Sequence, residues 1–332
     1  MARVVSGIRP TGKLHLGNYF GAVKNFLKMQ DEHDCFFFIA DIHSLTTHPK
    51  PSDLHDNVKQ VLAEHLAMGV DPEKCALFVQ SDVPAISELY TYMNMNAYVG
   101  ELERSTSFKD KIRTQKNNVN AGLLTYPVLM AVDILIHHAE MVPVGKDQQQ
   151  HLEMTRTYAN RFNHMFGVDY FKEPEAFSGG GELVKVPGLT AQGKMSKSSG
   201  DTDTIMFDEE EKPLRKKIMR AVTDNGPTEP GSEKSEGLQN LFDIMALVSE
   251  ESTIKHFEEL HQNATIRYGD LKKQIADDVI QFTSPIREKI NHFKQDDAAL
   301  AKAVKIGAEK ANESAQKTLK EVREIIGFRK FY

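Results

Sequence analysis

The sequence has few cysteines, no tryptophan and no excess of positive charge. Its 332 residues include two cysteines, Cys35 and Cys75, and neither has a second Cys or a His at zinc-binding spacing. We therefore expect two buried free thiols in a reducing compartment. The 41 Lys and Arg stand against 47 Asp and Glu, so the net charge is −6. An RNA partner would have to meet a local basic patch, because the chain as a whole is acidic.

Long apolar runs are also absent. No run is long enough to span a bilayer, and the N-terminus lacks the order of charged, apolar and small residues that is typical of a signal peptide. These absences predict a cytoplasmic protein with no membrane partner. The length is enough to bury a substantial core and favours one large domain with a smaller one beside it.

Apolar segments alternate with amphipathic ones through about the first 200 residues. The segments that fit strands are 3–6, 35–41, 76–80 and 141–144. Between them, apolar residues recur at helical spacing, as in Leu54, Val58 and Leu62, before the stop at Gly69. This alternation predicts an α/β protein, a Rossmann-type doubly wound parallel sheet that binds ligands at the carboxyl ends of its strands. The polar residues at such ends are His15, Asp41, His43 and Asp147.

The composition changes after about residue 200. Segment 225–237 is rich in Gly, Pro and Glu and predicts an exposed loop. The remainder is predicted to be helical and to end in a long amphipathic helix over 298–326. We therefore expect a smaller all-helical domain to follow the sheet. Its segment 215–220 predicts a basic helical face that is either solvated or able to meet RNA phosphate.

A glycine-rich turn follows the first predicted strand. Residues 6–18 contain a Gly/Pro turn and then His15-Leu-Gly-Asn18, which opens an amphipathic helix. The free N–H groups and positive dipole end of such a helix suit a triphosphate. Gly17 would let the ligand approach the backbone, and His15 and Asn18 could donate hydrogen bonds to phosphate oxygens. The spacing fits neither a Walker A loop nor a dinucleotide fingerprint.

A second candidate phosphate-binding segment is Lys194-Met-Ser-Lys-Ser198. Its two lysines, two hydroxyls and flanking glycines are typical of a mobile basic loop. Alone, such a run is more often a solvated surface loop. Its position after the last predicted strand, in a chain that also carries the glycine turn, favours a role at the same phosphate.

The two segments together resemble the two signatures of class I aminoacyl-tRNA synthetases. Either match is easy by chance, but both in this order and at these structural positions are specific. Outside these two segments, the chain resembles the bacterial tryptophanyl-tRNA synthetase family. This resemblance is strongest over residues 1–200. The segments that carry this resemblance are 6–12, 100–104, 108–111, 121–127, 130–135, 142–148 and 150–151.

The resemblance implies a two-step reaction in a homodimer. The tryptophan carboxylate would attack the α-phosphate of ATP, giving tryptophanyl-adenylate and pyrophosphate. A terminal ribose hydroxyl of tRNA(Trp) would then take the tryptophanyl group. The implied organisation is a catalytic domain over 1–188, the loop and an anticodon-recognising helical domain over 189–287, and a C-terminal helix over 288–332 that returns to the catalytic domain.

The resemblance also implies site residues. Those implied for catalysis are Lys111, Lys194, Ser196 and Lys197. Those implied for ATP are Arg9, Pro10, Thr11, His15, Gly17, Asn18, Gly145, Lys146, Asp147, Gln148, Val186, Lys194, Met195, Ser196, Lys197 and Ser198. Those implied for tryptophan are Gly7, His43, Tyr126, Met130, Asp133, Val142 and Val144. No protein metal ligand is implied, since Mg²⁺ would arrive with the ATP phosphates, and no DNA partner is implied.

Among these residues Asp133 has the most specific expected role. It would accept the indole N–H, the one polar atom of the tryptophan side chain, and so reject phenylalanine. The alternative is a structural acid that backbone groups satisfy. His43 could instead cap a strand end, and Lys111 could be a surface charge.

Two residues depart from the family pattern. Many bacterial members carry an aromatic residue where this chain has Val5, and Gln where it has Arg9. The floor of the indole pocket and the contact that joins the amino acid to ATP are therefore expected to differ.

Two rival functions are a tyrosine enzyme, which would need a different polar pair, and a non-ligating RNA-binding paralogue. Retention of His15, Gly17 and both signature lysines argues against the paralogue.

Overall fold

The computed structural model describes every residue except 115–116, 146–147, 178–183, 191–192, 198–199 and 332. Five parallel strands form one sheet in the order β3-β2-β1-β4-β5. Their bounds are β1 Arg3–Ile8, β2 Asp34–Ile39, β3 Ala76–Val79, β4 Met141–Val142 and β5 Glu175–Ala176. The chain proceeds outward from β1 to β3 and then returns to place β4 on the other side of β1. This reversal creates a crevice between the carboxyl ends of β1 and β4, where such sheets bind ligands.

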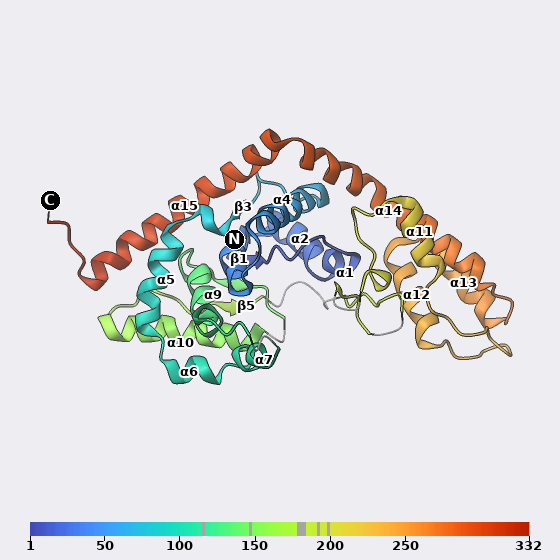
Figure 1. Cartoon of the computed structure of the whole chain (residues 1–332), viewed down its shortest axis with the longest axis horizontal. Helices are drawn as coiled ribbons and strands as arrows, with labels where there is room; N and C mark the ends of the chain where they lie inside the picture. Colours follow the sequence, from blue (N-terminus) through green and yellow to red (C-terminus); the bar gives the residue numbers. More distant parts are fainter. Residues whose placement is uncertain (115–116, 146–147, 178–183, 191–192, 198–199, 332) are drawn as a thin grey trace.

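Helices cover both faces of this sheet (Figure 1). The helices up to the end of α10 are α1 Leu16–Asn18, α2 Lys24–Glu32, α3 Asp41–Ser44, α4 Pro51–Met68, α5 Ala85–Asn96, α6 Val99–Arg104, α7 Thr106–Thr114, α8 Ala121–Leu124, α9 Tyr126–Leu135 and α10 Gln149–Phe166. A π-helical turn, Tyr19–Val23, joins α1 to α2. The expected doubly wound parallel sheet is thus confirmed.

The alternation of strand side chains explains why both faces are covered. In β2, Cys35 and Phe37 pack with α2 and α4, whereas Phe36 and Phe38 pack on the face that carries α5, α9 and α10. Strands that are apolar on both sides need helices on both sides. Cys35 and Cys75 are buried and free, as expected, and burial raises the pKa of each thiol to about 12.

Beyond residue 200 the chain is helical wherever the structure describes it as regular, apart from isolated bridges. The α-helices there are α11 Glu211–Met219, α12 Glu236–Val248, α13 Glu251–Gln262, α14 Tyr268–Gln295 and α15 Asp297–Ile326. α14 packs along α4 and also against α11 and α12. Phe282 of α14 stacks on Phe20, with ring centroids 5.8 Å apart. The helical part therefore packs directly on the unit that follows β1.

α15 crosses the open edge of the sheet at β3 (Figure 1). Leu300, near its start, packs in the core on the α4 side, whereas Ala311 and Ala315 pack in the core on the α5 side. Gly307 lies at the crossing point. A Cβ at Gly307 would overlap the Leu77 carbonyl of β3, so the two backbones are in direct contact there.

Gly307→Ala is therefore expected to destabilise the fold by about 2–4 kcal/mol, because helix and strand must separate to admit the methyl group. The free energy of unfolding in urea would measure this loss. Gly269→Ala in α14 is the matched control, since a Cβ there meets nothing within 4 Å. That variant should gain up to about 1 kcal/mol. Equal effects at the two sites would contradict the crossing geometry.

Candidate active site

A cavity of about 260 Å³ lies at the crevice between β1 and β4. Alternate residues of β1 and the segment that follows it supply one wall through Val5, Gly7 and Arg9. One face of α9 supplies another, because Tyr126, Met130 and Asp133 recur at helical spacing. All seven residues implied for tryptophan line this cavity, namely Gly7, His43, Tyr126, Met130, Asp133, Val142 and Val144. Their role on a ligand stays a prediction.

Asp133 is the buried carboxylate of this cavity and is 2% exposed. Its Oδ2 lies 2.8 Å from His43 Nε2, and its Oδ1 accepts a hydrogen bond of 2.7 Å from Gln80. Burial raises the pKa of Asp133, although His43 and Gln80 oppose that shift. Side chains therefore hold this acid. The alternative of a structural acid satisfied by backbone groups does not describe these contacts. Each carboxylate oxygen has two lone pairs, so Asp133 retains capacity for one further donor.

Two nitrogen atoms around the cavity have no hydrogen-bond partner among the described residues. They are Nε of Arg9 and Nδ1 of His43, and both atoms are buried. A buried donor without a partner costs about 1–3 kcal/mol, so such atoms are often explained by an absent ligand. Arg9 lies between the apolar cavity and the glycine turn, which suits an anion at their junction.

Two neighbours of the cavity were not expected from the sequence. Phe38 of β2 lines it, and Gln80, just after β3, holds Asp133. Gly7 and Phe38 are register partners on adjacent strands, and a Cβ at Gly7 would overlap the Phe38 ring. The signal for Phe38 was therefore the pairing of a glycine with a large aromatic residue across two strands. Gln80 offered no comparable signal.

The glycine turn places His15 at the start of α1. The His15 amide donates a 3.0 Å hydrogen bond to the Asn18 side chain, which closes the first turn. His15 is 7% exposed, and burial, reinforced by Lys197, lowers its pKa to about 4. Its imidazole is therefore neutral near pH 7. A Cβ at Gly17 would lie 2.9 Å from His15 Nδ1, so this glycine makes room for the His15 ring as well as for any ligand.

The Lys194–Lys197 segment packs against this turn. Met195 is 4% exposed, and its amide donates to the Val186 carbonyl at 2.8 Å, so two of the residues implied for ATP are neighbours. Lys197 Nζ donates to the carbonyls of Gly12 at 3.0 Å and Thr11 at 3.3 Å. The structure thus brings together the two segments that resemble family signatures.

The other residues predicted for ATP binding and catalysis lie in several separate segments of the chain. Gly145 and Gln148 line the same cavity as Arg9. Pro10 is buried in the glycine turn, Lys194 is exposed and Ser196 is half-buried. Lys111 lies in the last turn of α7. Lys146, Asp147 and Ser198 lie outside the described residues.

The basic segment 215–220 is not a uniform cationic face. Lys217 is 9% exposed and points inward, where its Nζ lies 2.6 Å from Glu209 and donates to the Thr204 carbonyl at 3.0 Å. Arg215 is paired with Asp277 at 2.7 Å. The expectation of a continuous basic face is therefore wrong for Lys217, because this residue anchors the chain after the signature loop. Lys216 and Arg220 remain exposed.

Known proteins with similar sequences share this architecture. A family model described as tRNA synthetases class I (W and Y) matches residues 1–284. A tryptophan–tRNA ligase of Porphyromonas gingivalis is 59% identical over 99% of this chain and 100% of its own length. One from Clostridium tetani is 41% identical over 98% and 95%. The solved structure of a Campylobacter jejuni tryptophanyl-tRNA synthetase, complexed with ADP and tryptophan, is 36% identical, covers 98% of this chain and 100% of that chain, and superposes with a TM-score of 0.89. With its buried Asp133 and paired signature segments, the chain belongs to the class I tRNA synthetases of the tryptophan and tyrosine family.

Proposed function

We propose that the chain is a tryptophan–tRNA ligase that uses ATP and L-tryptophan to charge tRNA(Trp). The observation that carries this function is the buried Asp133 in a cavity lined by the glycine turn, against which the Lys194–Lys197 segment packs. The tryptophan–tRNA ligases that resemble the chain over nearly its full length support the same function. The Campylobacter jejuni enzyme, solved with ADP and tryptophan, supports ATP and tryptophan as ligands.

The tryptophan side chain would enter the cavity with its indole N–H toward Asp133. Met130, Val142 and Val144 would contact the apolar ring, and Tyr126 would lie beside His43, whose ring centroid is 4.6 Å from its own. A buried acceptor aimed at one ligand donor discriminates strongly, because an analogue that lacks the donor leaves the acceptor unpaired. Phenylalanine lacks that donor and should be rejected.

The first step joins a tryptophan carboxylate oxygen to the α-phosphorus of ATP and breaks the bond from that phosphorus to the pyrophosphate oxygen. The protein contributes position and charge rather than a covalent intermediate. His15 and Asn18 would hold phosphate oxygens, and Arg9 would lie between the two substrates. Lys197 and Lys194, with Lys111, would neutralise charge on the departing pyrophosphate.

Mg²⁺ is proposed as a companion of the ATP phosphates. In the described part of the chain, no group of three or more His, Cys, Asp or Glu residues is placed to hold a metal ion. Mg²⁺ often keeps several waters and is bound largely through substrate phosphates.

We propose the catalytic unit over 1–188, the loop and anticodon-recognising helices over 189–287, and a C-terminal segment over 288–332 that contains the end of α14 and all of α15. None of the described helices combines the length and apolar character that a bilayer crossing needs. A cytoplasmic homodimer is proposed, and the exposed Met95, Tyr98 and Val99 near the junction of α5 and α6 support a subunit contact there.

Amino-acid-dependent exchange of labelled pyrophosphate into ATP tests this function. We expect exchange with tryptophan, and a value of kcat/KM for tyrosine or phenylalanine at least about 1,000-fold lower. Exchange with tyrosine alone would overturn the specificity. A properly folded protein that supports exchange with neither amino acid would favour the non-ligating paralogue.

A further inference from the structure

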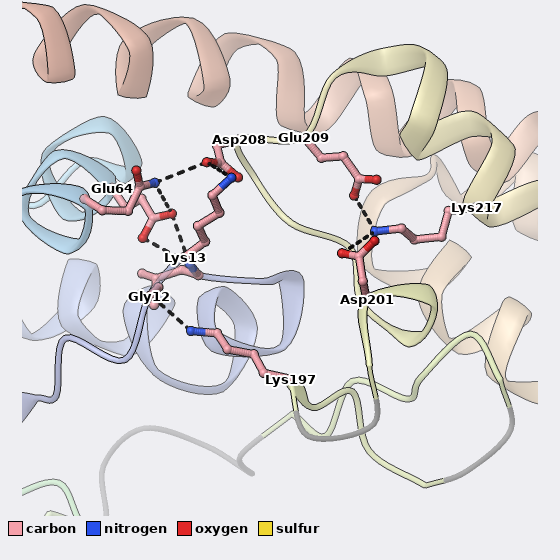
Figure 2. Close-up of polar contacts among 10 residues, drawn as sticks. Gly12, Lys13, Glu64, Lys197, Asp201, Asp208, Glu209 and Lys217 are labelled. Carbon is pink, nitrogen blue, oxygen red and sulfur yellow. Dashed lines mark hydrogen bonds and ion pairs between the residues drawn. The ribbon is translucent and has the colours of Figure 1, made fainter. Parts of the chain in front are cut away.

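A buried acid lies directly behind the glycine turn and has no part in the mechanism described so far. Glu64, on α4, is fully buried at 0% exposure. Both of its carboxylate oxygens lie 3.0 Å from the Leu14 amide nitrogen, and the Gln60 side chain donates to Oε1 at 2.8 Å. Leu14 immediately precedes His15, so Glu64 holds the backbone from which the signature turn begins (Figure 2).

The same turn is paired with the chain that leaves the signature loop. The Leu16 amide donates to the Ile205 carbonyl at 2.9 Å, and the Phe207 amide donates to the Leu14 carbonyl at 3.3 Å. The next residue, Asp208, accepts an ion pair of 2.9 Å from Lys13, and its side chain is 6% exposed. Leu14 is therefore held from one side by Glu64 and from the other by the segment after the loop.

Charge connects Glu64 to the loop itself. Lys197 is held at the carbonyls of Gly12 and Thr11, and its ammonium group and the Glu64 carboxylate attract one another. Figure 2 shows Lys197 directed at Gly12 while Lys13 points to Asp208. One buried carboxylate thus acts on the glycine turn by a hydrogen bond and on the signature lysine through its charge.

Such an acid is costly. A buried carboxylate loses its hydration, and an apolar side chain of similar volume in a helix core is often as stabilising or more so. Apart from Gln60 and His65, the neighbouring residues of α4 are apolar and buried, with Val61, Leu62 and Ala63 before Glu64 and Leu66 and Ala67 after it. Packing of α4 alone therefore does not account for an acid at this position.

We propose that Glu64 is a positioning residue for the adenylation step. It holds the Leu14 amide and attracts Lys197, and so fixes the two ATP-binding segments relative to each other before ATP binds. This inference rests on the proposed function. Glu64 is fully buried and is not among the residues that line the cavity, so it would act through His15 and Lys197.

Four side chains among the described residues bond to Glu64 or act on it through their charge. Gln60 lies on its own helix, Lys13 on the turn, Lys197 on the loop and Asp208 after the loop. Burial, reinforced by Asp208, raises the pKa of Glu64 to about 7, against the opposing effects of Gln60, Leu14 and Lys197. Because the pKa of an acid is raised, its charge, and with it the attraction for Lys197, is lost as the pH falls below about 7.

The decisive variant is Glu64→Gln, which keeps the shape and one acceptor but removes the charge. At about pH 8.5 we expect the KM for ATP in pyrophosphate exchange to rise about tenfold, with the KM for tryptophan within about twofold of wild type. The ratio of wild-type to variant kcat/KM for ATP should approach one by about pH 6, where wild-type Glu64 is protonated. ATP itself titrates in this range, but it does so for both proteins and cancels in the ratio.

Two further variants complete the test. Glu251→Gln removes an exposed carboxylate from α13 and should leave the ratio near one at every pH. Asp208→Asn removes the neighbouring negative charge and so should lower the pKa of Glu64. The fall of kcat/KM for ATP at acidic pH, the acid limb of the profile, should then move to lower pH. This shift tests the role of Glu64 even if Glu64→Gln fails to fold. A ratio that is independent of pH, or an acid limb that Asp208→Asn leaves in place, would overturn the role of Glu64. Absence of tryptophan-dependent exchange in wild type would instead overturn the proposed function.

Discussion

Replacing Lys197 with methionine is expected to lower kcat for tryptophan-dependent pyrophosphate exchange by about 100- to 1,000-fold. Removing one preorganised group that stabilises charge in a transition state typically has an effect of this size. The Lys197 ammonium group donates to the neutral carbonyls of Thr11 and Gly12, which it can exchange for phosphate oxygens at modest cost. The KM for tryptophan should change little, because the cavity that holds Asp133 is lined by other residues.

Lys212→Met is the matched control, since it removes one exposed positive charge from α11 without touching the turn. Steady-state exchange at saturating ATP separates kcat from KM. If Lys197→Met kept more than about a tenth of the wild-type kcat, the proposed role of Lys197 in the reaction would be wrong.

Asp133→Asn is expected to weaken tryptophan binding by about 10- to 100-fold while the KM for ATP stays within about twofold. An amide in this position presents N–H groups where Gln80 and His43 now meet carboxylate oxygens, so at least one donor loses its acceptor. The chain contains no tryptophan. Binding can therefore be followed by the fluorescence of the ligand's own indole, free of indole emission from the protein.

Asp270→Asn on the exposed start of α14 provides the control for an isosteric loss of charge. Thermal unfolding of both variants distinguishes a lost contact from a lost fold. An unchanged affinity for tryptophan in a folded Asp133→Asn protein would remove Asp133 from the recognition of the indole N–H.

The fold was predictable where local pattern determines it. Continuous apolar strands such as 35–41 predict helices on both faces, and the long apolar stripe over 298–326 corresponds to α15 at Asp297–Ile326. Short elements were less accessible. The strand expected over 141–144 is β4 at Met141–Val142, and α1 has three residues before a π-helical turn. Such short segments depend on tertiary pairing rather than on periodicity.

The residues of the candidate site also differ in how far the sequence predicted them. Asp133 and His43 were accessible through the family pattern, and the structure brings them within 2.8 Å of each other. Glu64 was not, because its partner is a backbone amide 50 residues earlier in the chain. Lys217 was expected to face solvent because a basic run on a short helix usually does, yet Glu209 and Thr204 fold back over it. Non-local partners of this kind leave no spacing to detect in a single sequence.

The crossing of α15 over β3 also bears on self-association. β3 is an outer strand, and an outer strand that is left uncovered offers free backbone groups to strands of other chains. Direct contact between Gly307 and the Leu77 backbone occupies part of that edge, and the opposite edge is the two-residue β5, which is too short to recruit a partner efficiently. In the folded protein the C-terminal helix therefore covers an edge that could otherwise pair with another chain, a role separate from any part it takes in aminoacylation.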